Sequence, residues 1–486
     1  MLLIVNRDLM LVGAGRLAAA FMALVTIRAV TTYLTPEQYG VLALLIAAQT
    51  FCGFFLVNPI GQYINLHTHT WWDDGSLLAR LKSYRRYIYA VSVVGGVGVF
   101  VTARQLPAQE ELLTAVAMAV MIVAGTWNAT FIWMLNMVGF RAASVLWTII
   151  TGAVGLASSV LLCLWLPTAT AWFSGQAIGM AAGALGSRFV LRKEAFGSML
   201  AKERMPLMEK SAVLTYCIPL AFATGLMWLQ LSGYRFLIES YWGLAKLGFL
   251  AVGLNLAGQV WSLAESLSMQ FFNPLFYKRI SQNENSGEVE LAFSDLLNTL
   301  VPVYFVLTGL LVLCAPYLLK VLVAPEFQNA VTFVMLGAVI ELCRVLGNLL
   351  SNAAHARRKT ISLALPYAAG GIVTFSFIYL AIRFHADVVW VGVSLIIGAM
   401  AMLLVMWFGM MRQVRFRLDY TRWIFGFSAM LVMSISTVML PKFSGFGYSF
   451  LMMLLLSLPA VIAIYALLRK SPALFRLLNV KLNKAA

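Results

Sequence analysis

Charged residues are scarce in this 486-residue chain, since Asp, Glu, Lys and Arg together make up only 11% of it. Soluble domains carry roughly 25% charged residues, so this chain has less than half the usual supply. The mean hydropathy is +0.86, and 61% of the residues are hydrophobic. These values exclude a cytosolic enzyme, a disordered protein and a disulfide-stapled secreted domain. They indicate a protein that folds in lipid.

Cysteine and histidine are rare, with five and four residues. The cysteines stand singly in apolar runs without a CxxC pair, so neither a disulfide framework nor a thiolate metal site is predicted. His67 and His69 form the closest histidine pair, and no carboxylate or thiolate follows at ligand spacing before Asp73. The chain also has no connecting segment long enough for a catalytic domain. We therefore expect no enzyme activity, no metal and no cofactor.

Long apolar runs dominate the sequence. A bilayer core needs about 20 apolar residues per helix. Runs of this length satisfy their backbone hydrogen bonds in lipid as helices, and the alternating pattern of a transmembrane barrel is missing. The expected spans lie near 9–33, 39–60, 87–103, 112–136, 144–166, 172–191, 212–234, 248–271, 295–319, 328–350, 361–382, 388–411, 423–440 and 447–468. The sequence thus predicts an all-α polytopic membrane protein with about 14 transmembrane helices.

The basic residues test this count. With a cytoplasmic N-terminus, 26 of the 35 Lys and Arg residues fall on the inner side, 6 on the outer side and 3 inside spans. Every inner connection is basic, as the positive-inside rule requires. The net charge of +16 therefore mainly sets orientation, and no nucleic-acid partner is expected. We predict a multi-pass membrane protein with both termini in the cytoplasm.

Two segments of the chain read alike, six spans apart. Arg28 precedes Gly40 by twelve residues and Arg235 precedes Gly248 by thirteen, and the glycines open similar runs, GVLAL and GFLAV. This separation keeps the orientation, so the repeat is parallel, and it predicts two six-helix lobes around a central cavity. The expected parts are an N-terminal lobe at 1–191 (helices 1–6), a basic cytoplasmic linker at 192–211, a C-terminal lobe at 212–411 (helices 7–12), and helices 13–14 with a basic tail at 412–486.

A helix-start signal precedes the second span. Thr35 can cap a helix, Pro36 suits its first turn, and Glu37 favours the positive end of the helix dipole. The whole segment 34–40 (LTPEQYG) resembles the LgpeeyG signature of polysaccharide-biosynthesis flippases, the Wzx-type members of the multidrug/oligosaccharidyl-lipid/polysaccharide exporter superfamily. Residues 234–238 (YRFLI) with the following Gly248 are similar to that family's DRflI…vGlY segment, although Tyr234 stands where Asp is common. Residues 324–327 (APEF) resemble its gpeF segment.

This resemblance implies a flippase that moves undecaprenyl-diphosphate-linked oligosaccharide repeat units from the cytoplasmic to the outer leaflet of the inner membrane. The product would feed exopolysaccharide or O-antigen biosynthesis, and transport would proceed by alternating access. A polysaccharide polymerase and a chain-length regulator are candidate partners, beside membrane lipid. The two additional helices also resemble the helix pair that forms a groove for the lipid tail in lipid II flippases. A flippase of this peptidoglycan precursor is therefore one alternative. A multidrug cation antiporter of the same superfamily is another.

Arginines inside the predicted spans are candidates for substrate binding. Intramembrane charges are costly and usually face a cavity or a partner. Arg16 lies within the first span, Arg28 near its outer end, and Arg235 at the end of the seventh. Arginine suits a diphosphate because its planar fork donates paired hydrogen bonds and keeps its charge. Snorkelling to the lipid headgroups is the alternative explanation.

The tenth span carries the richest polar stripe, with Glu341, Arg344 and Asn348 on one face. Glu341 and Arg344 stand three residues apart and can form an ion pair. The stripe fits either a structural ion pair between helices or a cavity wall that contacts sugar or phosphate.

The eighth span places Asn255 and Gln259 on one face, with Glu265 beside it. Hydrogen bonding between helices explains the two amides as well as substrate binding does. Glu265 has no evident partner in its own helix. Together with Glu341, it is our candidate for coupling transport to a proton or sodium gradient.

Overall fold

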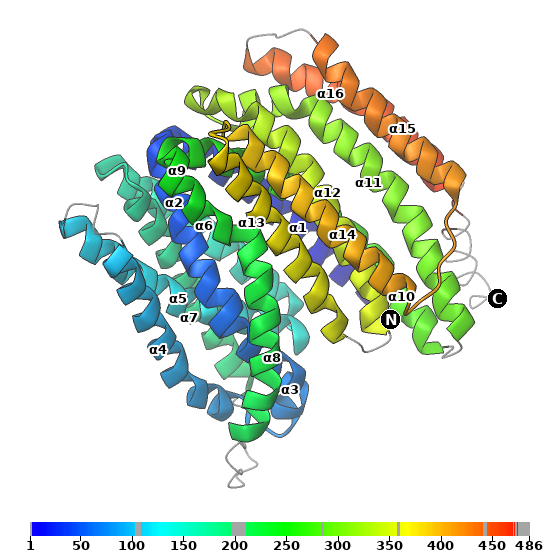
Figure 1. Cartoon of the computed structure of the whole chain (residues 1–486). Helices are drawn as coiled ribbons and strands as arrows, with labels where there is room; N and C mark the ends of the chain where they lie inside the picture. Colours follow the sequence, from blue (N-terminus) through cyan, green and yellow to red (C-terminus); the bar gives the residue numbers. More distant parts are fainter. Residues whose placement is uncertain are drawn as a thin grey trace. The chain divides into compact units, whose positions relative to one another are not determined.

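The computed structural model describes residues 2–102, 108–195, 210–282, 286–356, 360–440 and 445–469, together with positions 471 and 474. Helices make up nearly all of this part of the chain, and it contains no strand (Figure 1). A helix covers each of the fourteen predicted spans within these residues. The prediction of an all-α polytopic protein is confirmed.

Twelve helical segments of the described chain are long and apolar enough to cross a membrane. The two other predicted spans are occupied by α4 (Leu77–Thr102) and α7 (Ala169–Ala195). Basic residues fill the first half of α4, and small residues lower the hydropathy of α7. Many large apolar side chains are exposed along the helices, as expected where lipid is the solvent. The chain is a multi-pass membrane protein.

Contacts divide the chain into two compact units, Met1–Gly248 and Phe249–Ala486. The helices of the first unit are α1 (Leu2–Tyr33), α2 (Pro36–Phe51), α3 (Asn58–Asp73), α4, α5 (Ala108–Met137), α6 (Arg141–Trp165), α7, α8 (Lys210–Trp228) and α9 (Tyr234–Trp242). A π-helical stretch, Cys52–Val57, joins α2 to α3, and another, Leu229–Gly233, joins α8 to α9.

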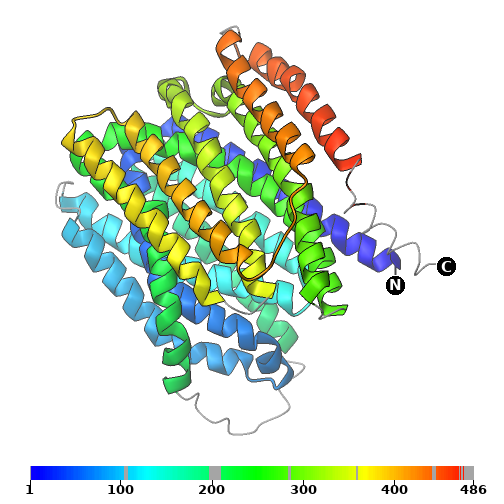
Figure 2. The same cartoon turned by 45° about the vertical axis from the view of Figure 1, so that its right-hand side comes forward.

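The second unit contains most of α10 (Leu244–Gln282), which begins at the end of the first. It continues with α11 (Ser286–Leu322), α12 (Val331–Ala356), α13 (Ala364–Arg383), α14 (Val389–Met411), α15 (Tyr420–Ser436) and α16 (Phe446–Arg469). The α15–α16 pair packs on α11, as both views show (Figures 1 and 2). Val306, Leu313 and Met433 belong to the apolar cluster between these helices.

The helix-start prediction at Thr35 is confirmed. The Thr35 hydroxyl accepts a hydrogen bond from the backbone N–H of Gln38 at 3.3 Å, and Pro36 and Glu37 occupy the first turn of α2. This cap stabilises the helix start because it satisfies one of the four N–H groups that lack a partner inside the helix.

Several helices run further than the sequence predicted. The second span was expected to end near residue 60, yet the helix continues through the π stretch and α3 to Asp73. The polar residues in α3 do not interrupt the helix. The Thr68 hydroxyl, for example, donates a hydrogen bond to the Ile64 carbonyl one turn earlier, at 2.9 Å. The seventh span likewise continues past Arg235 to Trp242, and it ends only where Gly243 adopts a φ of 83°.

α8 packs within the first unit. Thr224 donates a hydrogen bond to the Phe54 carbonyl at 2.6 Å, and the Trp228 indole donates to the Ala47 carbonyl at 3.0 Å. The sequence repeat had assigned this helix to the second lobe. Most of the predicted linker 192–211 and the end of the predicted tail lie outside the described residues. The four predicted parts and the cavity between the lobes therefore stay a prediction.

The two repeat glycines meet in the structure. A β-carbon at Gly40 would collide with the carbonyl oxygen of Leu244, and one at Gly248 would collide with that of Pro36. Each glycine thus packs on the residue four positions before the other glycine. This reciprocal contact lets the starts of α2 and α10 cross at backbone distance, and only a residue without a side chain permits it.

Candidate functional site

A cluster of charged and amide side chains joins α10 and α12 in the second unit. Arg344 of α12 contacts two carboxylates, Glu341 through Nε at 2.6 Å and Glu265 of α10 through Nη1 at 3.0 Å. Asn348 donates a hydrogen bond to the other oxygen of Glu265 at 2.8 Å. We call these four residues the α10–α12 cluster. It holds two acids and one base in the middle of apolar helices.

Helical spacing explains how α12 presents its part of the cluster. Glu341, Arg344 and Asn348 follow one another at intervals of three and four residues, so their side chains share a face. Gly258 of α10 lies opposite, since a β-carbon there would be in van der Waals contact with a Glu341 oxygen, at 3.4 Å. The guanidinium fork of Arg344 can then reach acids on both helices at once.

The charges of the α10–α12 cluster are partly shielded from solvent. The side chains of Arg344, Glu265 and Glu341 are 26%, 18% and 19% exposed. Two carboxylates and one guanidinium leave a formal charge of −1 when both acids are ionised. Because an uncompensated charge in this setting is costly, a proton or a small cation would stabilise the cluster.

The structure confirms the predicted ion pair between Glu341 and Arg344. Glu265 was expected to lack a partner in its own helix, and its partners Arg344 and Asn348 indeed come from α12. Sequence reasoning missed this link, because Glu265 and Asn348 are 83 residues apart. The only signal for it was that opposite charges occurred in two otherwise apolar spans.

The remaining predicted residues of α10 precede the α10–α12 cluster along the helix. Asn255 is exposed and Gln259 is half-buried. They lie about two to three turns before Glu265, at 3.6 residues per turn. Their proposed role in substrate binding stays a prediction.

The three arginines predicted in the first half of the chain belong to the first unit. Arg16 and Arg28 are exposed on α1. Arg235, which opens α9 with Tyr234, donates a hydrogen bond from Nη1 to the carbonyl of Ala43 on α2 at 3.1 Å. This bond uses one of the five donors of the guanidinium and leaves the others available. The role of all three arginines stays a prediction.

Metal-ligating residues do not gather in the part of the chain that the structure describes, where no group of three or more His, Cys, Asp or Glu side chains could hold an ion. The acidic turn at Asp73 and Asp74 is structural, since Asp74 accepts a hydrogen bond from the backbone N–H of Ser76 at 2.9 Å. Within the described residues, one arginine bridges two acids at two places: in the α10–α12 cluster, and where Arg279 of α10 contacts Glu288 and Asp295 of α11.

Comparisons with known proteins give no match by sequence, either to a family model or to a curated protein. By structure, the chain is similar to the lipid II flippase MurJ in an inward closed conformation, with a TM-score of 0.63 at 10% identity, covering 95% of this chain and 98% of that one. It is also similar to an inward-facing multidrug resistance MATE family transporter of the MOP superfamily, with a TM-score of 0.55 at 12% identity, covering 82% and 94%. The chain therefore has the fold of these two solved structures.

Proposed function

We propose that this protein is a flippase that moves undecaprenyl-diphosphate-linked oligosaccharide repeat units to the outer leaflet of the inner membrane, for exopolysaccharide or O-antigen biosynthesis. The observation that carries the proposal is the likeness to a lipid II flippase along 95% of the chain. The likeness to the multidrug transporter covers only 82%. A lipid-linked substrate fits the longer match better than a small cation does.

In this proposal, arginines neutralise the diphosphate. Arg16, Arg28 and Arg235 bring three permanent positive charges to apolar helices, and guanidinium groups bind phosphate oxygens through paired hydrogen bonds. Asn255, Gln259 and Asn348 supply hydrogen bonds to sugar hydroxyls. The polyprenyl tail stays in the bilayer while the headgroup crosses by alternating access.

The α10–α12 cluster supplies the coupling ion site. Its formal charge of −1 is neutralised when Glu265 or Glu341 takes up a proton or when a sodium ion binds the carboxylate oxygens. Loss of that ion frees a carboxylate to compete for Arg344, so the ion and the contacts between α10 and α12 depend on each other. A proton or sodium gradient would thereby drive the transport cycle.

Two other substrates remain as alternatives. Lipid II carries the same diphosphate and polyprenyl groups, so the arginines would serve it equally. A multidrug cation antiporter is favoured by one observation, the excess of carboxylates over arginine in the α10–α12 cluster. In either case, the fold and the ion site keep the roles described above.

Transport in vesicles tests the proposal. The full chain is reconstituted with a fluorescent undecaprenyl-diphosphate oligosaccharide, with labelled lipid II, or with an organic cation dye, and movement across the membrane is followed by accessibility to a quencher. We expect movement of the oligosaccharide lipid, with strong loss in Arg16→Ala, partial recovery in Arg16→Lys, and normal rates in the control Arg383→Ala on exposed α13 surface. Movement of lipid II alone or of the dye alone would replace the proposal with the matching alternative. Full activity of Arg16→Ala would remove Arg16 from the mechanism.

A polysaccharide polymerase and a chain-length regulator are the partners that this function requires downstream. Their contribution is tested by co-purification with the full chain from membranes. Transport in vesicles that contain only the flippase would show that they are not needed for the translocation step itself.

A further inference from the structure

A cavity of about 710 Å³ lies in the first unit, lined by residues of α4, α5 and α7. These three helices pack side by side, with α4 along the edge of the unit (Figure 1). Among the described residues, the lining combines apolar side chains with four basic ones and includes neither Asp nor Glu. Its basic residues are Lys82, Arg85, Arg188 and Arg192. None of them takes part in the proposed transport site.

The four basic residues gather at one end of the cavity. Lys82 and Arg85 stand one turn apart near the start of α4, and Arg188 and Arg192 stand one turn apart near the end of α7. All four are exposed, and the guanidinium of Arg85 lies 5.6 Å from the centre of the Tyr89 ring. Within the described residues, no carboxylate forms an ion pair with any of the four.

The other part of the cavity is apolar. Trp127 and Val123 of α5 face Leu185 of α7 and the α4 surface that leads from Arg85 to Ser92. Seven residues of helix span about 10 Å, so the apolar lining continues well away from the charged end. Two of the lining residues, Leu81 and Phe131, also belong to the buried apolar cluster through which α3, α4, α5 and α7 pack together. This packing holds the cavity walls in place.

We infer that this cavity binds an anionic phospholipid of the cytoplasmic leaflet as a resident ligand. The predicted topology places the basic end at the cytoplasmic surface, where anionic lipids concentrate. Four cations with no acid among the described lining residues attract a phosphate group, and arginine forks bind its oxygens in pairs. The apolar wall can contact an acyl chain of the lipid, because both lie at the same depth in the bilayer. Free phosphate matches only the charged end, and a neutral lipid matches only the apolar part.

The bound lipid has a physical consequence for the first unit. Its negative charge reduces the mutual repulsion of the four basic side chains, and one headgroup links α4 to α7. We therefore expect the lipid to stabilise this unit, because a ligand that binds only the folded state adds to its stability. The inference is independent of the transported substrate.

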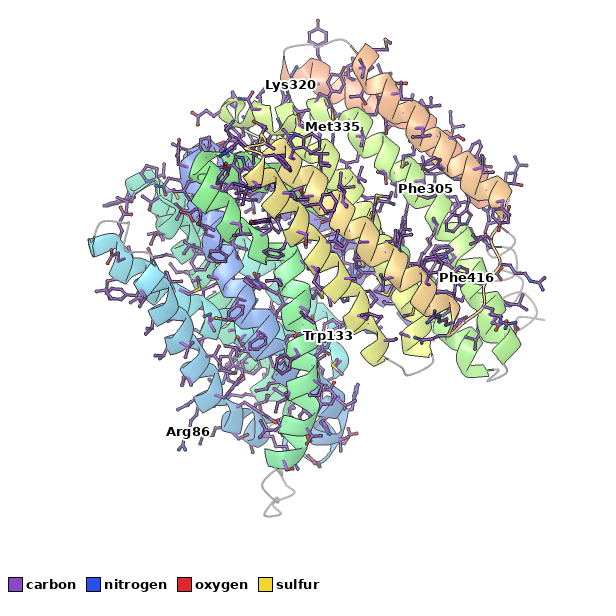
Figure 3. The ribbon with its side chains drawn as sticks, in the orientation of Figure 1. Arg86, Trp133, Phe305, Lys320, Met335 and Phe416 are labelled. Carbon is purple, nitrogen blue, oxygen red and sulfur yellow. The ribbon has the colours of Figure 1, made fainter. Side chains whose placement is uncertain are left out.

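Lipid binding to paired variants tests this inference. The full chain in neutral detergent is titrated with phosphatidylglycerol, phosphatidylcholine or inorganic phosphate, and the thermal midpoint and the lipid retained in native mass spectrometry are measured. The test variant is Arg85→Gln/Arg188→Gln. The control variant is Arg86→Gln/Lys193→Gln, which removes the same charge from the same two helices outside the cavity lining. Arg86 lies at the outer edge of α4 (Figure 3).

We expect phosphatidylglycerol to raise the midpoint of the unmodified chain and of the control variant. Near a membrane surface each basic residue contributes about 1 kcal/mol to anionic lipid binding, so the test variant should bind about 30-fold more weakly. Leu185→Trp, which fills the apolar part without changing charge, should also lose lipid. Equal loss in test and control variants would overturn the inference, since binding would then follow total charge. Equal stabilisation by inorganic phosphate would reduce the site to an anion site, and equal stabilisation by phosphatidylcholine would remove the role of charge.

Discussion

The two units differ in how their charged side chains are paired. In the α10–α12 cluster of the second unit, Arg344 contacts both Glu265 and Glu341. In the α4–α5–α7 cavity of the first unit, four basic residues share one space, and none forms an ion pair with a described carboxylate. In the first arrangement each charged side chain has a partner of opposite sign, with one negative charge in excess, whereas the second leaves its positive charges for a ligand from outside.

Depth in the bilayer explains why the charges are paired in one unit and unpaired in the other. The cluster lies within long apolar helices, where a charge without a partner costs several kcal/mol. The cavity places its basic residues at the ends of α4 and α7, where water and headgroups solvate them. Unpaired basic side chains therefore persist at the membrane surface, whereas the charged side chains of the α10–α12 cluster form ion pairs. Mutations should reveal this as a large contrast in stability.

The largest effect is expected for Arg344→Ala. This change leaves Glu265 and Glu341 facing each other without a base, and removing one partner of a buried ion pair costs about 3 kcal/mol or more. The thermal midpoint of the purified protein should fall strongly, whereas Arg383→Ala, at an exposed position on α13, should leave it unchanged. The triple change Arg344→Met, Glu265→Gln and Glu341→Gln should recover most of the loss. An unchanged midpoint in Arg344→Ala alone would show that the cluster is solvated.

A smaller effect on stability, with a clear effect on transport, is expected for Glu265→Gln. The amide keeps a hydrogen-bonding oxygen for Arg344 and Asn348, so the cost should be about 1 kcal/mol. The cluster then becomes formally neutral, and the need for a proton or sodium ion disappears. Transport in vesicles should lose its dependence on the gradient, whereas Glu326→Gln, at an exposed site, should keep it. Unchanged gradient dependence in Glu265→Gln would separate this residue from coupling.

The smallest effect on stability is expected for Arg85→Gln in lipid-free detergent. Arg85 is exposed and forms no ion pair with a described carboxylate. Its removal should change the free energy of unfolding by less than about 0.5 kcal/mol, as for most surface substitutions. Relief of repulsion from Lys82, Arg188 and Arg192 should make the change neutral or slightly stabilising. A drop as large as that of Arg344→Ala would contradict the contrast between the two units.

Much of the fold was accessible from sequence because lipid imposes a simple rule on the backbone. Helices cover all fourteen predicted spans, and the cap at Thr35 forms as its side chain dictates. Helix ends were harder to predict. The helix α3, for example, continues to Asp73 through polar residues, among them Thr68, which donates a hydrogen bond to the preceding turn. Hydropathy marks where a helix enters lipid, whereas hydrogen bonding decides where the helix stops.

Only some contacts of the candidate site could be predicted from the sequence. Residues three positions apart on one helix are neighbours, so the pair of Glu341 and Arg344 follows from spacing alone. The partner of Glu265 required two helices to be placed against each other. The same holds for Arg235, whose bond to the Ala43 carbonyl depends on how α9 meets α2.

The amino-acid order alone determines that this chain is helical and lives in a membrane, because composition and run length are properties of the chain itself. It also reveals a repeat through Gly40 and Gly248. Only the tertiary structure shows that these two glycines pack against each other's helix start and that Glu265 shares Arg344 with Glu341. The cavity between α4, α5 and α7 is likewise a product of packing. Local sequence specifies which groups a helix carries, whereas contacts between distant segments decide which of those groups meet.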